Sequence, residues 1–217
     1  MVISWNRIGH RHEICRQYEA AGAAVIVAEN GWIHAPGRKF YALCLNHHNG
    51  AGRWHVGADD RFGKLGIDLK PWREKGDHIL VLPQRGIGEP GIAMPRQWMV
   101  GIEKRLKESM RLRRPIRMRH HPGQSDRPLE PDLENCHAVV TWASGAAIKA
   151  IAAGVPAFYE LKDWIGGPAA KRGFKDLEAP FLGDRMPMFH RLSWAQWTAD
   201  EISTGEPFKW LLALRSQ

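Results

Sequence analysis

The hydrophobic positions of the chain form short runs separated by polar, glycine-rich segments, and such runs predict buried strands. Six of them are found, at residues 23–28, 40–45, 78–83, 115–119, 137–142 and 155–159. Three helices are predicted beside them, at residues 12–21, 96–111 and 145–153. Helix 96–111 has the clearest period, because Trp98, Ile102 and Leu106 recur every four residues. The alternation of strands and helices after residue 78 predicts an α/β fold with a Rossmann-type parallel sheet flanked by helices.

The composition also suggests how the chain is divided. A stretch rich in glycine and charge, residues 53–76, is interpreted as a linker between two lobes. Near the end of the chain, Thr198 and Glu201 have the spacing of a helix capping box. We therefore expect three parts: a reduced N-terminal lobe at 1–70, a Rossmann-like lobe at 71–190, and a helical tail at 191–217 that packs back on the body.

The totals indicate a globular, cytoplasmic protein. The chain has 217 residues, of which 44% are hydrophobic and 25% charged, as in ordinary soluble domains. It lacks an apolar run of about 18 residues, so no membrane-spanning helix is expected. The first residues do not have the layout of a signal peptide. The three cysteines are scattered without metal-binding spacing, which is typical of a reducing compartment.

The charge leaves two interpretations open. The formal net charge is +8 and the pI about 9.7, which favours either a polyanionic partner or simply a soluble surface. Between Lys104 and Arg119 there are eight basic residues, with Glu108 as the only acid. We take part of this stretch as a candidate nucleic-acid patch: Lys107, Arg111, Arg113, Arg114 and Arg117.

The turn at Ser144-Gly145 is the first candidate for chemistry. It follows the strand at 137–142 and begins the helix at 145–153, so unpaired backbone N–H groups lie at the positive end of a helix dipole. Such a terminus suits a phosphate or diphosphate. Lys149, one turn further on, adds a cation within reach. The alternative is that Ser144 is only an N-cap, as on many helices.

Other predicted strands end in polar residues as well. In open α/β sheets, ligands bind outside the carboxyl ends of the strands, so these residues are expected to share one edge. The segment 86–91 matches G-x-G-x-x-G, but Pro90 and Pro95 delay the next helix and argue against a dinucleotide site. The candidates for binding phosphate or donor are Gln84, Arg85, Gly86, Arg119, His120, His121, Ser144, Gly145, Lys149 and Glu160. The alternative for the histidines is an ordinary surface turn.

Glu29-Asn30-Gly31 ends the first predicted strand and supplies a carboxylate. Such a group can act as a general base on a hydroxyl, or can cap a neighbouring loop. The polar loop that follows the strand at 40–45 adds candidates for an acceptor or loop role: Gly31, His48, Asn49 and Gly50. Adjacent histidine pairs lack zinc-motif spacing, so no metal site is expected.

Four blocks together resemble the GT-B glycosyltransferases of the capsular-polysaccharide-synthesis type, which are related to Kdo transferases. These are VAENGWI (27–33), LKPWREKGDHILVLPQ (69–84), RMRHHPG (117–123) and VVTWASGAAIKAIAAGVPAF (139–158). Within this group the chain resembles short, uncharacterised phage-encoded proteins, which share a tail like RLSWAQWTADEISTGEPF (191–208).

The resemblance implies a GT-B-like fold and transfer of a sugar from a nucleotide-sugar to a hydroxyl, without a metal or other cofactor. It places His121, Ser144 and Gly145 at the donor nucleotide and a base at Glu29, with Asn30 beside it. Two departures stand out: Asn30 replaces the group's aspartate, and Lys149 replaces the acid of its S-x-x-x-x-E element. The acceptor would be a modified DNA base or a glycan, acted on in the host cytoplasm if the protein is phage-encoded. The rival interpretation is an inactive GT-B-like module that binds nucleic acid or a nucleotide.

Overall fold

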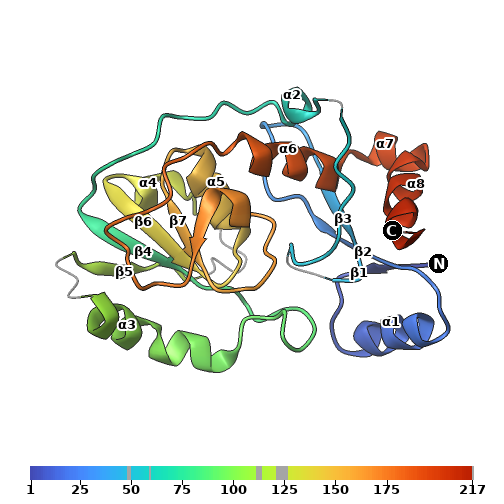
Figure 1. Cartoon of the computed structure of the whole chain (residues 1–217), viewed down its shortest axis with the longest axis horizontal. Helices are drawn as coiled ribbons and strands as arrows, with labels where there is room; N and C mark the ends of the chain where they lie inside the picture. The colour runs from blue at the N-terminus through green and yellow to red at the C-terminus, as the bar shows by residue number, and fades with distance from the viewer. Residues whose placement is uncertain (48–49, 59, 111–113, 121–126, 217) are drawn as a thin grey trace.

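The chain folds into two β-sheets joined by loops and flanked by helices (Figure 1). The structure is a computed structural model that describes residues 1–47, 50–58, 60–110, 114–120 and 127–216. The larger sheet has the order β5 (Ile116–Met118), β4 (His78–Leu82), β6 (Cys136–Thr141), β7 (Ala157–Tyr159) and β8 (Ala170–Arg172). The smaller sheet has the order β1 (Val2–Trp5), β2 (Val25–Asn30), β3 (Tyr41–Leu45) and β9 (Gln196–Trp197).

All pairs in the larger sheet are parallel, which confirms the α/β sheet predicted from the alternation of elements. Its core strands are buried on both faces. Ile79 and Val81 of β4 pack with Trp98 and Ile102 of α3 (Arg96–Met110) on one face. Leu80 and its neighbours face the other side, which α5 (Gly145–Ala152) covers. Figure 1 shows α3 and α5 on opposite sides of this sheet, the arrangement expected of a Rossmann-like fold.

The strand order creates a switch point between β4 and β6. From β4 the chain moves outward to β5, then returns to the other side of β4 as β6. The connections after β4 and β6 therefore diverge, leaving a crevice at the carboxyl ends of these two strands. Gln84 and Ser144 lie at these two ends.

The smaller sheet is mixed, with β1 and β2 parallel and β3 antiparallel to both β2 and β9. One face packs against α1 (His10–Ala20) through Cys15 and Val25. The other face packs against Trp194 of α6 (Met186–Ala195) and Leu211 of α8 (Glu206–Ala213). The C-terminal segment therefore completes the N-terminal sheet.

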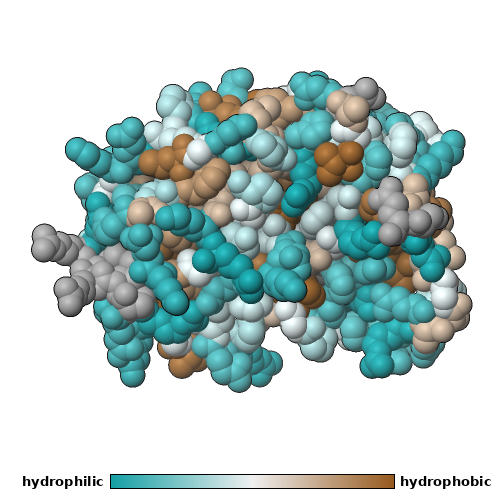
Figure 2. All heavy atoms as spheres, in the orientation of Figure 1, coloured by the Kyte–Doolittle hydropathy of each residue, from teal (hydrophilic) through white to brown (hydrophobic). Residues whose placement is uncertain are grey.

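The remaining elements are short: α2 (Phe62–Leu65), α4 (Glu130–Leu133), α7 (Ala199–Ser203) and the 3₁₀ turns η1 (Gly167–Ala169) and η2 (Leu214–Ser216). The capping box predicted at Thr198 and Glu201 is confirmed, with both reciprocal hydrogen bonds formed. The sequence did not predict β1, β8 or β9. Within the described ranges, no helix is long and apolar enough to cross a membrane. Figure 2 shows a face on which hydrophilic residues surround scattered apolar ones.

Candidate functional site

A cavity of about 610 Å³ opens where the ends of the two sheets meet. Its walls come from the carboxyl ends of β1, β2, β4 and β6, the segments after β5, and the start of α5. The structure brings nine of the predicted site residues to this cavity: Glu29, Asn30, Gly31, Gln84, Arg85, Arg119, Ser144, Gly145 and Lys149. Residues of the N-terminal sheet thus face residues of the parallel sheet across one space.

Other predicted site residues lie elsewhere. Gly50, Gly86, His120 and Glu160 are not among the described residues that line the cavity. Glu160 accepts hydrogen bonds from Trp98 and Arg105 of α3, and so lies on the α3 side of the parallel sheet. Five of the predicted residues fall outside the described residues: the donor candidate His121, the loop candidates His48 and Asn49, and the patch residues Arg111 and Arg113.

Ser144 is the N-cap of α5. Its hydroxyl oxygen accepts a hydrogen bond from the Ala146 N–H at 3.2 Å, and its own N–H donates to the Thr141 hydroxyl at 3.0 Å. The cap interpretation of Ser144 is therefore realised in the structure. A serine hydroxyl that accepts still has a proton to donate, so capping leaves one hydrogen bond available to a ligand oxygen.

Gln84 braces the turn from the neighbouring strand end. Its side-chain oxygen accepts from the Ala143 N–H at 3.0 Å, and its nitrogen donates to the Ala143 carbonyl at 3.3 Å. The carboxamide is thus engaged with the backbone immediately before Ser144. This bracing was not foreseen from the sequence, where Gln84 was a candidate ligand.

The four basic side chains among the described residues that line the cavity differ in what they already bind. Arg119 pairs with Asp132 and donates to the Pro128 carbonyl at 3.0 Å, and Arg127 pairs with Asp132 at 2.7 Å. Lys149 and Arg85 form no ion pair with any residue that the structure describes. Their charges are consequently the ones most available to an anion in the cavity.

Glu29 reaches the opposite wall from β2 and is 9% exposed. Its charge adds to the effect of burial in raising the pKa of the neighbouring Cys44 thiol. Beyond it, the Gly31 N–H donates to the Phe40 carbonyl at 2.9 Å. A β-carbon on Gly31 would lie 2.8 Å from that carbonyl oxygen, so only glycine lets the two backbones approach here.

Trp5, Asn6 and Trp32 are among the lining residues that sequence reasoning missed. Trp5 is 41% exposed and makes an edge contact with Tyr41, with ring centroids 5.9 Å apart. The signal that could have found Trp5 and Asn6 is the short run V-I-S-W, which is β1. Its carboxyl end joins the same edge as Glu29, because β1 and β2 are parallel.

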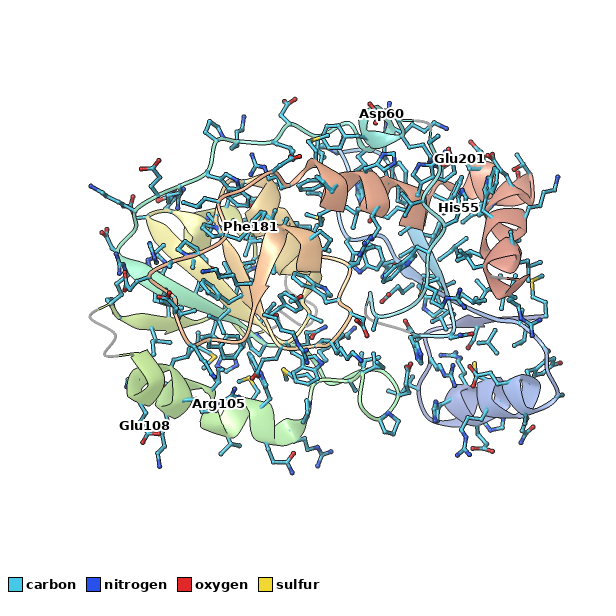
Figure 3. The ribbon with its side chains drawn as sticks, viewed as in Figure 1. His55, Asp60, Arg105, Glu108, Phe181 and Glu201 are labelled. Atoms are coloured by element: carbon cyan, nitrogen blue, oxygen red, sulfur yellow. The ribbon has the colours of Figure 1, made fainter. Side chains whose placement is uncertain are left out.

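Two of the three described residues of the candidate nucleic-acid patch pair with carboxylates. Lys107 pairs with Glu103 at 2.6 Å, and Arg114 pairs with Glu178. On the same helix, Lys104 pairs with Glu108 at 3.7 Å and Arg105 pairs with Glu160; Figure 3 labels Arg105 and Glu108 on α3. Arg117 is exposed. A phosphate backbone would have to compete with these carboxylates for most of the described basic side chains.

No protein-family model and no curated protein matches the chain. Among the described residues, no group of three or more histidine, cysteine, aspartate or glutamate side chains could hold a metal ion.

Proposed function

We propose that the protein is a GT-B-like glycosyltransferase that binds a nucleotide-sugar in this cavity and transfers the sugar to a hydroxyl acceptor. The observation that carries the proposal is the opposition of two walls. One wall offers a helix N-terminus and the cations Lys149 and Arg85, and the other offers the carboxylate of Glu29. The cavity also lies at a topological switch point, where open α/β sheets bind ligands.

The chemistry follows from these two walls. Glu29 accepts the proton of the acceptor hydroxyl, whose oxygen forms a bond to the anomeric carbon as the bond from that carbon to the phosphate oxygen of the donor breaks. The leaving nucleotide gains negative charge on its phosphate, which the α5 N-terminus, Lys149 and Arg85 stabilise. Asn30, next in the chain, can donate a hydrogen bond from its amide to the acceptor. These groups need no metal to neutralise the leaving group.

A thermal-shift screen tests the donor half of this proposal. UDP, CMP, GDP and their sugar conjugates are added without metal, and a ligand at a hundred times its dissociation constant adds about 2.7 kcal/mol to stability. We expect at least one conjugate to raise the melting temperature of the wild type and to have no effect on Ser144→Trp, which fills the mouth of the turn. A panel without any shift would count against a nucleotide at this cavity.

Glu29→Gln separates transfer from mere binding. The amide keeps the shape of the side chain but cannot take a proton, so we expect turnover to be lost while the ligand-induced thermal shift is kept. The rival, an inactive module, is favoured by Asn30 and Lys149, which depart from the family pattern. It would be supported if the wild type binds the nucleotide-sugar but transfers nothing to any acceptor, and Glu29→Gln then changes neither property.

A further inference from the structure

Gln196, in the C-terminal segment, is fully buried beside the cavity wall. Its side-chain oxygen accepts hydrogen bonds from the N–H groups of Trp32 and, at 3.1 Å, Ile33. Its side-chain nitrogen donates to the Ile33 carbonyl at 2.8 Å. One carboxamide therefore satisfies three backbone groups that lie more than 160 residues away in the chain.

Trp32 connects these hydrogen bonds to the site. The ring lines the cavity and is 9% exposed. It packs so closely on the start of α5 that a β-carbon on Gly145 would lie 3.2 Å from Cδ1 of the indole. The indole therefore covers the N-terminus of α5. Because Trp32 is only three residues after Glu29, the same segment also carries the carboxylate of the opposite wall.

The strand that carries Gln196 is itself held in place. Gln196 pairs with Ala42 and Trp197 with Tyr41 in the register of β3 and β9. The Arg61 guanidinium lies 3.9 Å from the centre of the Trp197 ring and pairs with Glu201 at 3.0 Å. Figure 3 labels Glu201 on this C-terminal side of the molecule. The carboxamide is therefore presented from a strand that is held by contacts of its own.

We propose that Gln196 is a positioning residue of the cavity: it acts through Trp32, fixing the indole on the α5 N-terminus and the segment after Glu29 at the opposite wall. This inference rests on the proposed function. It assigns the C-terminal segment a part in the binding site, beyond completing the N-terminal sheet.

The test uses the full chain and inorganic pyrophosphate as a probe that carries no base or sugar. Gln196→Met is close in size but leaves the three backbone groups without their partner. We expect the amide hydrogens of Trp32 and Ile33 to exchange about tenfold faster or more, and pyrophosphate affinity measured by calorimetry to fall by about tenfold. Gln196→Glu keeps both acceptor contacts and should recover part of the affinity.

Thr198→Ala is the matched control. It lies two residues further along the same segment and removes the cap of α7, which destabilises the fold without touching Trp32. We expect unchanged exchange at Trp32 and unchanged pyrophosphate affinity. If Thr198→Ala lowers affinity as much as Gln196→Met does, the loss reflects general destabilisation and the positioning role is overturned.

A double-mutant cycle with Gly145→Ala shows whether Gln196 acts through Trp32. The added methyl group presses on an indole that Gln196 holds in place, so it should weaken pyrophosphate binding in the wild type and do so less in Gln196→Met. Strictly additive effects would overturn the inference. If the wild type and Gln196→Met bind pyrophosphate equally well, only the positioning role is overturned. If the wild type binds no pyrophosphate, the proposed function is overturned and this inference with it.

Discussion

The cations of the cavity show why burial and pairing matter more than residue type. Arg119 and Lys149 both line the cavity, but Arg119 is already held by Asp132. The amino acids on their own suggested that both would bind a phosphate. The pairing of Arg119 depends on how the chain returns to α4 thirteen residues later, which no local pattern reveals.

Lys149 is the cation whose removal should affect binding most directly. We expect Lys149→Met to weaken pyrophosphate or nucleotide affinity by roughly tenfold or more, because it deletes a charge-assisted hydrogen bond in a partly enclosed site. Unfolding by urea should change little, since Lys149 forms no ion pair with the described residues. Lys162→Met, a lysine that does not line the cavity, should bind as the wild type does. Equal losses in both variants would show that only net charge matters.

At the scale of elements, α5 ends at a point where backbone geometry demands glycine. Gly154 has a φ of 79°, and a β-carbon there would lie 2.0 Å from the Pro71 carbonyl oxygen. The strand that follows, β7, depends on this tight return. The helix that begins at the candidate site is thus anchored at its other end by the segment before β4.

Gly154→Ala should therefore lower the free energy of unfolding by more than the strain of a left-handed backbone alone would. We expect a loss of more than about 2 kcal/mol in unfolding free energy, measured by urea denaturation, since a φ penalty of about 1–2 kcal/mol adds to a clash with backbone. Gly173→Ala is the matched control, because its φ is 82° but nothing lies within 4 Å of the added carbon. Equal costs for both variants would mean that Pro71 moves aside freely.

Glu160 shows that a polar residue at the end of a strand does not always face the ligand site. It follows β7 and was placed with the donor-binding residues, yet it lies against α3. Side chains alternate along a strand, so Glu160 shares the side of Phe158, whose ring packs with α3. The alternation of side chains along β7, continued to the residue that follows the strand, would have predicted that Glu160 lies on the α3 side.

For the whole molecule, the sequence predicted four of the five strands of the parallel sheet but only the two central strands of the smaller sheet, β2 and β3. All residues of β4 and β6 are buried, and such continuous apolar runs between helices specify a parallel sheet. In contrast, β9 is two residues long and forms only because the tail crosses back to β3. Six of the nine candidate residues at the cavity follow strands of the parallel sheet and were expected at one edge of it. The roles of Gln196 and Trp32, in contrast, depend on tertiary contacts that leave no local pattern.

Two histidines at the amino ends of the parallel sheet make stability depend on pH. His78 and His137 are 0% and 2% exposed, and the Nε2–H of each ring donates to a backbone carbonyl, that of Asp132 and that of Leu177 respectively. The other ring nitrogen of each is buried without a hydrogen-bond partner among the described residues. Burial lowers the pKa of both imidazoles below the ordinary value of 6.5, and nearby arginines act in the same direction.

The direction of the pH effect follows from proton binding. Below pH 6.5 the unfolded chain binds protons that the folded chain, with its lowered histidine pKa values, does not. The free energy of unfolding is therefore highest above this pH and falls as the solution is acidified.

We expect the urea midpoint to drop between about pH 7.5 and pH 5.5, with a shallower drop in the double variant His78→Gln/His137→Gln. Carboxylates with lowered pKa values, such as Glu201, titrate below this window and should not obscure it. If the double variant loses stability as steeply as the wild type, these histidines are not the acid-sensitive groups.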